Sequence, residues 1–200
     1  MSHLHCRSLL PAAIAADAFA SPSAHAQCDA GDPRWDMINA PRSPSPHIVA
    51  GEDPQARLFD RMIGTWDVAY TFIAADGSRQ DAPGQFIAGW VLDGTAVQDL
   101  WIGVPPGQTE RFIGTTIRFF DTERRTWRVT WVAPFARAVT LLEGSGDARQ
   151  IILLGDSPSG KLRWSFNDIT ANDFIWRGEL STDNGATWRL REEHHMRRRV

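Results

Sequence analysis

The chain has 200 residues, which is enough for one domain with a hydrophobic core and short for two. Its 42% apolar and 22% charged residues exclude wholesale disorder, and a net charge of −3 gives no electrostatic reason to expect a nucleic-acid partner. No apolar run reaches the roughly 18 residues that a membrane-spanning helix needs. Nine Trp and ten Phe stand beside a single Tyr.

Residues 1–26 have the outline of a secretory signal peptide. Arg7 precedes small and apolar residues at 8–16, and Ala-His-Ala at 24–26 supplies a small-x-small cleavage pattern. We therefore expect a periplasmic or secreted protein, and otherwise a cytoplasmic one in which this segment is a disordered tail. Cleavage would leave Cys28 as the only thiol, so that no intramolecular disulfide could form.

Proline recurs through residues 27–54, which predicts a linker or a wrapping arm. In residues 55–63, Leu58 and Phe59 are each followed four positions later by another apolar residue. This spacing predicts a short helix, which Gly64 ends.

Residues 55–200 are expected to form an all-β domain, because short aromatic and β-branched runs alternate with turn signals from Gly64 onward. The connections are too short for crossover helices, so neighbouring strands should pair antiparallel. An up-and-down, lipocalin-like barrel of about ten strands fits best, with a two-sheet sandwich as the alternative. The predicted strands are 65–74, 84–92, 95–103, 112–121, 126–133, 138–145, 149–155, 161–169, 173–182 and 187–197.

Alternation along these strands places the aromatic rings inside and much of the arginine outside. The inward rings either form a filled core or surround an apolar ligand. The candidate ligand-binding residues are Trp66, Tyr70, Trp90, Trp101, Trp127, Trp131, Trp164, Trp176 and Trp188. Two predicted strands are apolar on both faces, at Phe119–Phe120 and at 151–154, and their outward groups would meet the helix, the arm or a second copy in a homodimer.

The motifs Gly64-Thr65-Trp66, Trp-Val-Leu-Asp-Gly at 90–94 and the closing hairpin around Asp183-Asn184-Gly185 occur in a characteristic order. With them, residues 55–197 resemble a bacterial domain family of unknown function with a lipocalin-like barrel. The resemblance implies the fold and the binding of an apolar small molecule, and implies no activity. The Gly-x-Trp opening is also similar to that of nitrobindin-type haem barrels, whose further glycines are replaced here.

Histidines on the last predicted strand are the main candidates for chemistry. The alternation set by Trp188 and Leu190 places Glu192 and His194 inward. Such a pair can serve as a general base, a proton relay or a metal ligand, and His194 would be the proximal ligand of a haem. No CxxC or HxxxH motif is present, so a structural zinc site is not expected, and we predict no cofactor.

Two aspartates are further catalytic candidates. Asp99 shares a strand face with Trp101, and Asp168 shares one with Trp164. A carboxylate among aromatic rings has a raised pKa, as a catalytic acid requires. With the inward His and Glu, either would suit isomerisation, hydration or cyclisation; alternatively, each pairs with an arginine.

Arginines on two neighbouring predicted strands complete the candidates. An Arg that faces inward would bind the carboxylate of a fatty or aromatic acid. Arg118 and Arg128 lie on these strands, and alternation places Arg128 outside.

Four functions remain open from the sequence. The leading one is a carrier that holds an apolar small molecule. The others are a small cofactor-free enzyme, a haem-binding barrel, and a filled barrel that binds proteins through its outer face.

Overall fold

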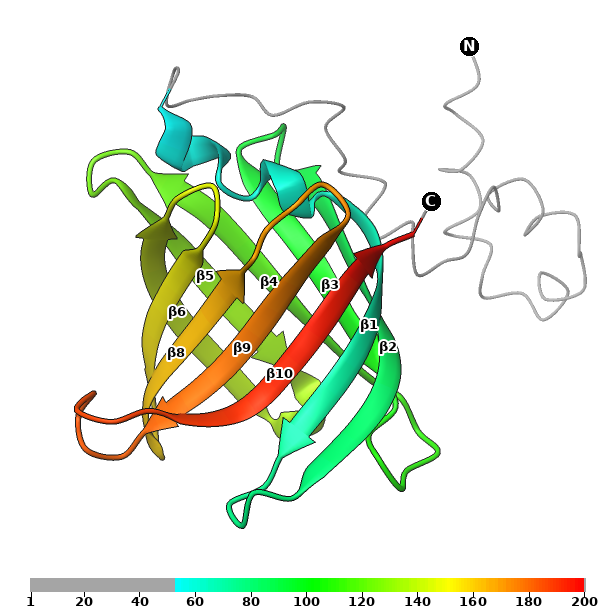
Figure 1. Cartoon of the computed structure of the whole chain (residues 1–200). Helices are drawn as coiled ribbons and strands as arrows, with labels where there is room; N and C mark the ends of the chain where they lie inside the picture. Colours follow the sequence, from blue (N-terminus) through cyan, green and yellow to red (C-terminus); the bar gives the residue numbers. More distant parts are fainter. Residues whose placement is uncertain (1–52, 200) are drawn as a thin grey trace, which may run out of the picture. The chain divides into compact units, whose positions relative to one another are not determined.

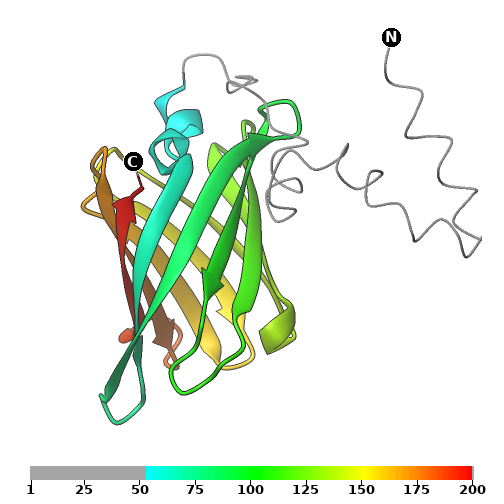
Figure 2. The same ribbon diagram turned by 90° about the vertical axis from the view of Figure 1, so that its right-hand side faces the viewer.

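The computed structural model describes residues 53–199, which form a closed barrel of ten antiparallel strands (Figure 1, Figure 2). Each strand pairs with its neighbours in sequence, and β1 closes the barrel against β10. The up-and-down barrel of about ten strands is confirmed, and the sandwich alternative is wrong. The expected signal peptide at 1–26, and all but the last two residues of the arm at 27–54, lie outside the described residues.

The strand bounds follow the turn signals closely. The strands are β1 Gly64–Ile73, β2 Arg79–Val91, β3 Ala96–Gly103, β4 Phe112–Asp121, β5 Thr126–Ala133, β6 Ala138–Gly146, β7 Ile151–Ser157, β8 Gly160–Asn167, β9 Asp173–Ser181 and β10 Arg189–Arg198. The largest difference is at β2, which begins five residues before the predicted start at 84. Pro83 and Gly84 resemble a break in the sequence but lie within the ladder, opposite Ala69 and Val68.

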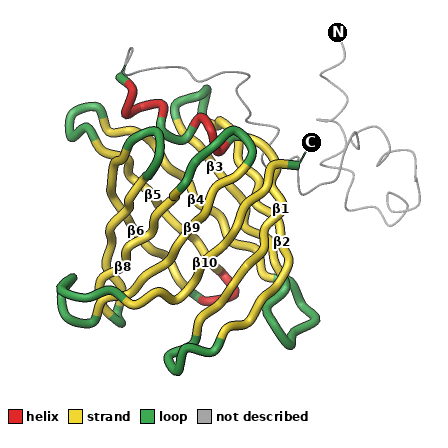
Figure 3. Tube along the Cα trace, viewed as in Figure 1, coloured by secondary structure: helices red, strands yellow, loops and turns green. Residues whose placement is uncertain are grey.

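The predicted short helix at 55–63 is present in 3-10 form, as two turns, η3 at Pro54–Arg57 and η4 at Asp60–Met62. Asp53 caps the first turn by accepting from the Gln55 amide at 3.0 Å. Both turns lie over one end of the barrel (Figure 1, Figure 3). Between them, the fully buried Phe59 packs edge-on against Trp127 and Phe166, with ring centroids 4.7 and 5.4 Å away. This packing closes that end of the barrel.

Side chains of the barrel hold the 3-10 turns in place. The indole of Trp66 donates to the Met62 carbonyl at 2.9 Å, and the indole of Trp127 donates to the Gln55 carbonyl at 2.7 Å. Arg198 donates to three backbone carbonyls, of which one lies in η4 and one just after it, and its guanidinium lies 4.0 Å above the Trp66 ring. The closed end is therefore tied to β1, β5 and β10.

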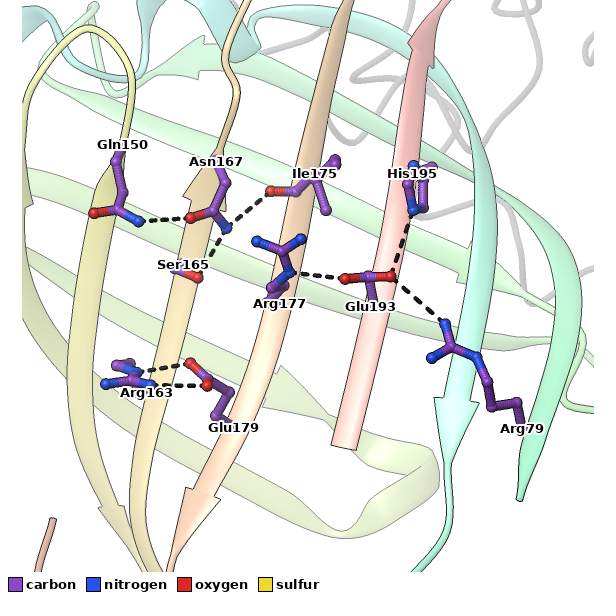
Figure 4. Close-up of polar contacts among 10 residues, drawn as sticks. All are labelled: Arg79, Gln150, Arg163, Ser165, Asn167, Ile175, Arg177, Glu179, Glu193 and His195. Carbon is purple, nitrogen blue, oxygen red and sulfur yellow. Dashed lines mark hydrogen bonds and ion pairs between the residues drawn. The ribbon is translucent and has the colours of Figure 1, made fainter. Parts of the chain in front are cut away.

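Charged and polar side chains on the outer face of β8, β9 and β10 pair across the strands, as Figure 4 shows. The closest contacts across the strands are 2.6 Å for Arg163–Glu179 and 2.8 Å for Arg177–Glu193, and within β10 His195 lies 3.6 Å from Glu193. Arginine therefore faces outward on these strands, as alternation predicts.

A β-bulge in β10 changes which residues face inward. Leu190 lies opposite Glu179, whereas Glu192 lies opposite Gly178, so Arg191 is the extra residue. The bulge reverses the alternation, and Leu190 shares the outer side with Glu179. The prediction that Glu192 and His194 face inward rests on inward positions of Trp188 and Leu190, which are wrong. Glu192 and His194 nevertheless face the interior, because the bulge shifts the alternation by one residue.

Outward apolar side chains remain on the described surface. Phe119 is 47% exposed and Leu154 is 52% exposed, whereas Phe120 turns inward toward Trp127. The homodimer expected from such groups stays a prediction. None of the helices formed by residues 53–199 has the length and apolar character to cross a membrane.

Candidate functional site

The barrel encloses a cavity of about 850 Å³. It extends from Arg118, beside the closed end, to the β3–β4 loop and the 3-10 turn η5 (Pro134–Ala136) at the opposite end, where it opens. Its volume lies in the range of about 300–1,000 Å³ that is typical of small-molecule sites. The site is therefore a deep pocket with one closed and one open end.

Aromatic rings form a large part of the cavity wall. Five of the nine predicted ligand-binding residues line it: Tyr70, Trp101, Trp131, Trp164 and Trp176. Ring centroids are 6.1 Å apart between Trp131 and Trp164, and 5.5 Å apart both from Trp164 to Trp176 and from Trp176 to Trp101. The four indoles therefore make a continuous apolar band around the cavity.

The other four predicted residues do not line the cavity. Trp66, Trp90 and Trp127 are buried in the hydrophobic core. Trp188 lies on the outer face, where the Arg163 guanidinium is 4.4 Å from its ring centroid. Its predicted inward position is wrong, because the bulge at Arg191 separates Trp188 from the alternation of Glu192 and His194.

Glycines make room for the cavity rings. A Cβ atom on Gly84 would collide with the Tyr70 ring and the Ile102 carbonyl, and one on Gly114 would collide with the Trp131 ring. These indole and phenol rings therefore lie flat against the neighbouring strands. Gly84 on β2 and Gly114 on β4 thus leave the space that these two rings occupy.

His194 and Glu192 form a polar pair in this aromatic wall. The His194 side chain is 2% exposed, and its Nε2 lies 3.2 Å from a carboxylate oxygen of Glu192. The imidazole stacks on Trp176 at 4.8 Å and meets Tyr70 edge-on at 4.6 Å. Its Nδ1 is buried without a partner among the described residues. Such a pair can accept a proton from a molecule in the cavity or relay one.

Tyr70 contributes a hydroxyl as well as a ring. The phenol donates to the Ile102 carbonyl at 3.5 Å. Burial, reinforced by the negative charge of Glu192, raises the pKa of Tyr70 well above its ordinary value. The phenol therefore stays protonated and acts as a hydrogen-bond donor.

Asp99 and Arg118 form a buried ion pair on adjacent strands. Asp99 is 0% exposed and Arg118 is 1% exposed. Thr116 connects them: its amide donates to Asp99 at 3.0 Å, its hydroxyl donates to the same carboxylate, and Arg118 Nη2 donates to that hydroxyl. Asp99 is thus paired with an arginine, as the alternative interpretation held, and it does not line the cavity.

Arg118 itself lines the cavity and keeps two nitrogens without partners. Nη2 serves Asp99 and Thr116, whereas Nε and Nη1 are buried with no hydrogen-bond acceptor among the described residues. Burial lowers the pKa of Arg118 to about 9, so the guanidinium is still charged at neutral pH. Arg118 shares an inward face with Phe112 and Thr116 in the alternation of β4. This alternation is the sequence signal from which its inward position could have been predicted.

Asp168 does not belong to the site. It is exposed in the turn after β8, which ends at Asn167, and its φ of +52° is left-handed. The expectation that it shares the face of Trp164 is wrong because the strand ends before it. Of the four predicted catalytic residues, only Glu192 and His194 therefore meet in the cavity.

The described part of the chain offers little to hold a metal. Residues 53–199 contain no cluster of three or more His, Cys, Asp or Glu side chains suited to a metal ion. His195 lies on the outer face beside Glu193 (Figure 4), whereas His194 lines the cavity. Ligation of a haem iron through Nε2 of His194 would require Glu192 to move.

No protein-family model and no curated protein matches this sequence. Among solved structures, the S-type phycobiliprotein lyase CPES from Guillardia theta is similar, with a TM-score of 0.55 and 11% identity over 72% of this chain and 92% of that one. Rv2717c from M. tuberculosis is similar with a TM-score of 0.56 and 9% identity, over 74% of this chain and 99% of that one. These similarities show that the chain shares its β-barrel fold with both proteins.

Proposed function

We propose that this barrel binds an apolar small molecule in its central cavity and carries it without changing it. The observation that supports this most is the wall itself, a band of four indoles and one phenol around about 850 Å³. Burial of an apolar molecule against such rings is favourable in proportion to the area removed from water. The barrel also agrees with the resemblance to a lipocalin-like domain family of unknown function.

A titration with the fluorescent apolar dye N-phenyl-1-naphthylamine tests this proposal. Leu153 lines the cavity, and its neighbour Leu154 is exposed on the outer face. The larger ring of Leu153→Trp would occupy space that the dye needs, so this variant should weaken dye binding at least about tenfold, which corresponds to about 1.4 kcal/mol. Leu154→Trp is the matched control and should leave the affinity unchanged. Equal binding by both variants would place the dye outside the cavity.

A second candidate function is proton-transfer catalysis by the pair of His194 and Glu192. The 3.2 Å contact of these groups inside a ligand-sized cavity favours it. The lyase among the similar structures also indicates that this fold serves enzymes. In this function His194 takes a proton from a bound molecule, and Glu192 stabilises the imidazolium that forms.

We also propose export, followed by cleavage before Gln27. Native mass spectrometry of the protein from its own source tests both the leader and the ligand. A mass equal to that of the chain from Gln27 onward supports export. An additional mass on the order of a few hundred daltons, as for a drug-sized ligand, supports the carrier function. Protein-bound haem absorbs at roughly 400 nm, so an absorption band at this wavelength would favour the haem alternative instead.

A further inference from the structure

We infer that the cavity selects an apolar molecule with a neutral oxygen acceptor, such as a ketone or an amide carbonyl, and that this oxygen binds Arg118 at the closed end. The inference rests on the proposed function and specifies its ligand class.

The unpartnered nitrogens of Arg118 are the first step. A guanidinium has five N–H donors, and here only Nη2 has acceptors among the described residues. A buried donor without an acceptor costs free energy, and more so on a charged group. The guanidinium carbon of Arg118 lies 4.5 Å from the Phe59 ring centroid, on the side of the closed end, and Arg118 also lines the cavity. A ligand acceptor would therefore approach Arg118 from the cavity.

The charge of the surroundings decides which acceptor fits. Asp99 already balances the positive charge of Arg118 in this buried place. A ligand carboxylate would add a second negative charge there, and Glu192 is a further acidic group in the cavity wall. Burial of an unbalanced charge is costly, whereas a carbonyl oxygen accepts a hydrogen bond and adds no charge. The inward arginine thus favours a neutral acceptor over the acid expected from the sequence.

The aromatic band sets the orientation of the rest of the molecule. Trp131, Trp164 and Trp176 line the cavity between Arg118 and the open end. A ligand whose oxygen lies at Arg118 therefore places its apolar body along these rings. The polar side chains of Gln108 and Arg111 lie at the mouth, where that body ends.

Three pyrene probes of equal ring size test the inference: 1-acetylpyrene, which carries a ketone, 1-ethylpyrene, which has no oxygen, and 1-pyrenecarboxylate, which is an anion. Their dissociation constants are measured by quenching of tryptophan fluorescence. The carbonyl stretching frequency of bound 1-acetylpyrene gives an independent readout, because a hydrogen bond from a guanidinium lowers it.

The variant is Asp99→Asn combined with Arg118→Met, which removes both charges together. In the wild type the Thr116 amide and the Thr116 hydroxyl both donate to the Asp99 carboxylate. The side-chain amide that Asp99→Asn introduces can form hydrogen bonds with both groups, so neither is left without a partner. Arg128→Met is the matched control, because Arg128 lies on the next strand and pairs outside with Glu143 at 3.2 Å. Circular dichroism and thermal unfolding establish that each variant is folded.

The expected result is that the double variant reduces the preference for 1-acetylpyrene over 1-ethylpyrene at least about tenfold, the effect of losing one hydrogen bond to a charged group. The carbonyl frequency should rise in the same variant, and Arg128→Met should change neither quantity. An unchanged preference overturns the inference, as does a larger loss for 1-pyrenecarboxylate than for 1-acetylpyrene. If no pyrene binds the wild-type protein, the proposed carrier function fails first.

Discussion

Arg118 on β4 and Asp99 on β3 form an ion pair inside the barrel, with both side chains at most 1% exposed. Removal of one partner leaves the other charged and buried. Arg118→Met alone should therefore lower the free energy of unfolding by about 3–5 kcal/mol, whereas the combination with Asp99→Asn should restore most of that loss. Urea denaturation of the two single variants and the double variant measures this. Losses that simply add in the double variant would show that the two groups do not interact in solution.

Trp66 should contribute far more to stability than Trp188. Trp66 is fully buried, bonds the Met62 carbonyl and lies edge-on to Phe174 at 4.8 Å. Trp66→Ala should cost about 3–5 kcal/mol. Trp188→Ala removes a half-buried ring with one Arg163 contact and should cost only about 1 kcal/mol. Equal losses in thermal unfolding would mean that the inside and the outside of the barrel are assigned wrongly at these positions.

Local chemistry made most of the fold predictable. Gly-rich and Asp/Asn-containing turns separate the strands, so the bounds of β4 and β5 could be predicted to the residue. The bulge at Arg191 was not predictable, because one extra residue in a strand leaves no trace in composition. It changed the side on which Trp188 lies. The exposed turn at Asp168 was missed for a similar reason, since alternation does not indicate where a strand ends.

The cavity itself could not be predicted from alternation. Trp66 and Trp131 both occupy inward positions in the alternation of their strands. Trp66 lies in the packed core, whereas Trp131 lies on the cavity wall. Phe59 decides the difference, because it fills the barrel at the end where the 3-10 turns cover it. Its position depends on contacts with Trp127 and Phe166, which are distant in sequence.

Two glycine substitutions should separate stability from binding. A Cβ on Gly84 would collide with the backbone carbonyl of Ile102, which cannot move away, so Gly84→Ala should lower the free energy of unfolding by about 1–3 kcal/mol. On Gly114 the nearest atoms all belong to the Trp131 ring, which can swing into the cavity. Gly114→Ala should therefore cost less stability and weaken binding of N-phenyl-1-naphthylamine. Unfolding and dye titration of both variants check this, and the reverse order of effects would contradict it.

Glu193 should make the barrel less stable in acid. The hydrogen bond from Arg177 holds the pKa of Glu193 below its ordinary value of 4.5. The folded state therefore binds fewer protons than the unfolded state, and this stabilisation is present above pH 4.5 and is lost as the pH falls through the folded pKa. Glu193→Gln should reduce the loss of stability between about pH 5 and pH 3 in urea titrations. Glu123→Gln, at an exposed turn, is the control and should keep the wild-type slope.

His194 distinguishes the two candidate functions. Its ring faces the cavity and stacks on Trp176, so His194→Ala should leave the barrel folded and cost about 1 kcal/mol. A variant that does not fold would make His194 a structural core group and remove the support for proton transfer.

The decisive measurement on folded His194→Ala is deuterium exchange into the methyl group of bound 1-acetylpyrene in D₂O. In proton transfer by His194 and Glu192, the imidazole takes a proton from the methyl group of the ketone, and the negative charge that forms on the carbonyl oxygen lies beside Arg118. A deuteron then returns to the methyl carbon. In the wild type, the bound ketone should then exchange faster than the free ketone. His195→Ala is the control, because the His195 ring lies outside beside Glu193, and it should exchange as fast as the wild type. In His194→Ala, the bound ketone should exchange at the rate of the free ketone. A carrier holds the same ketone with no acceleration in any of the three proteins, because nothing in carriage requires the imidazole to take a proton.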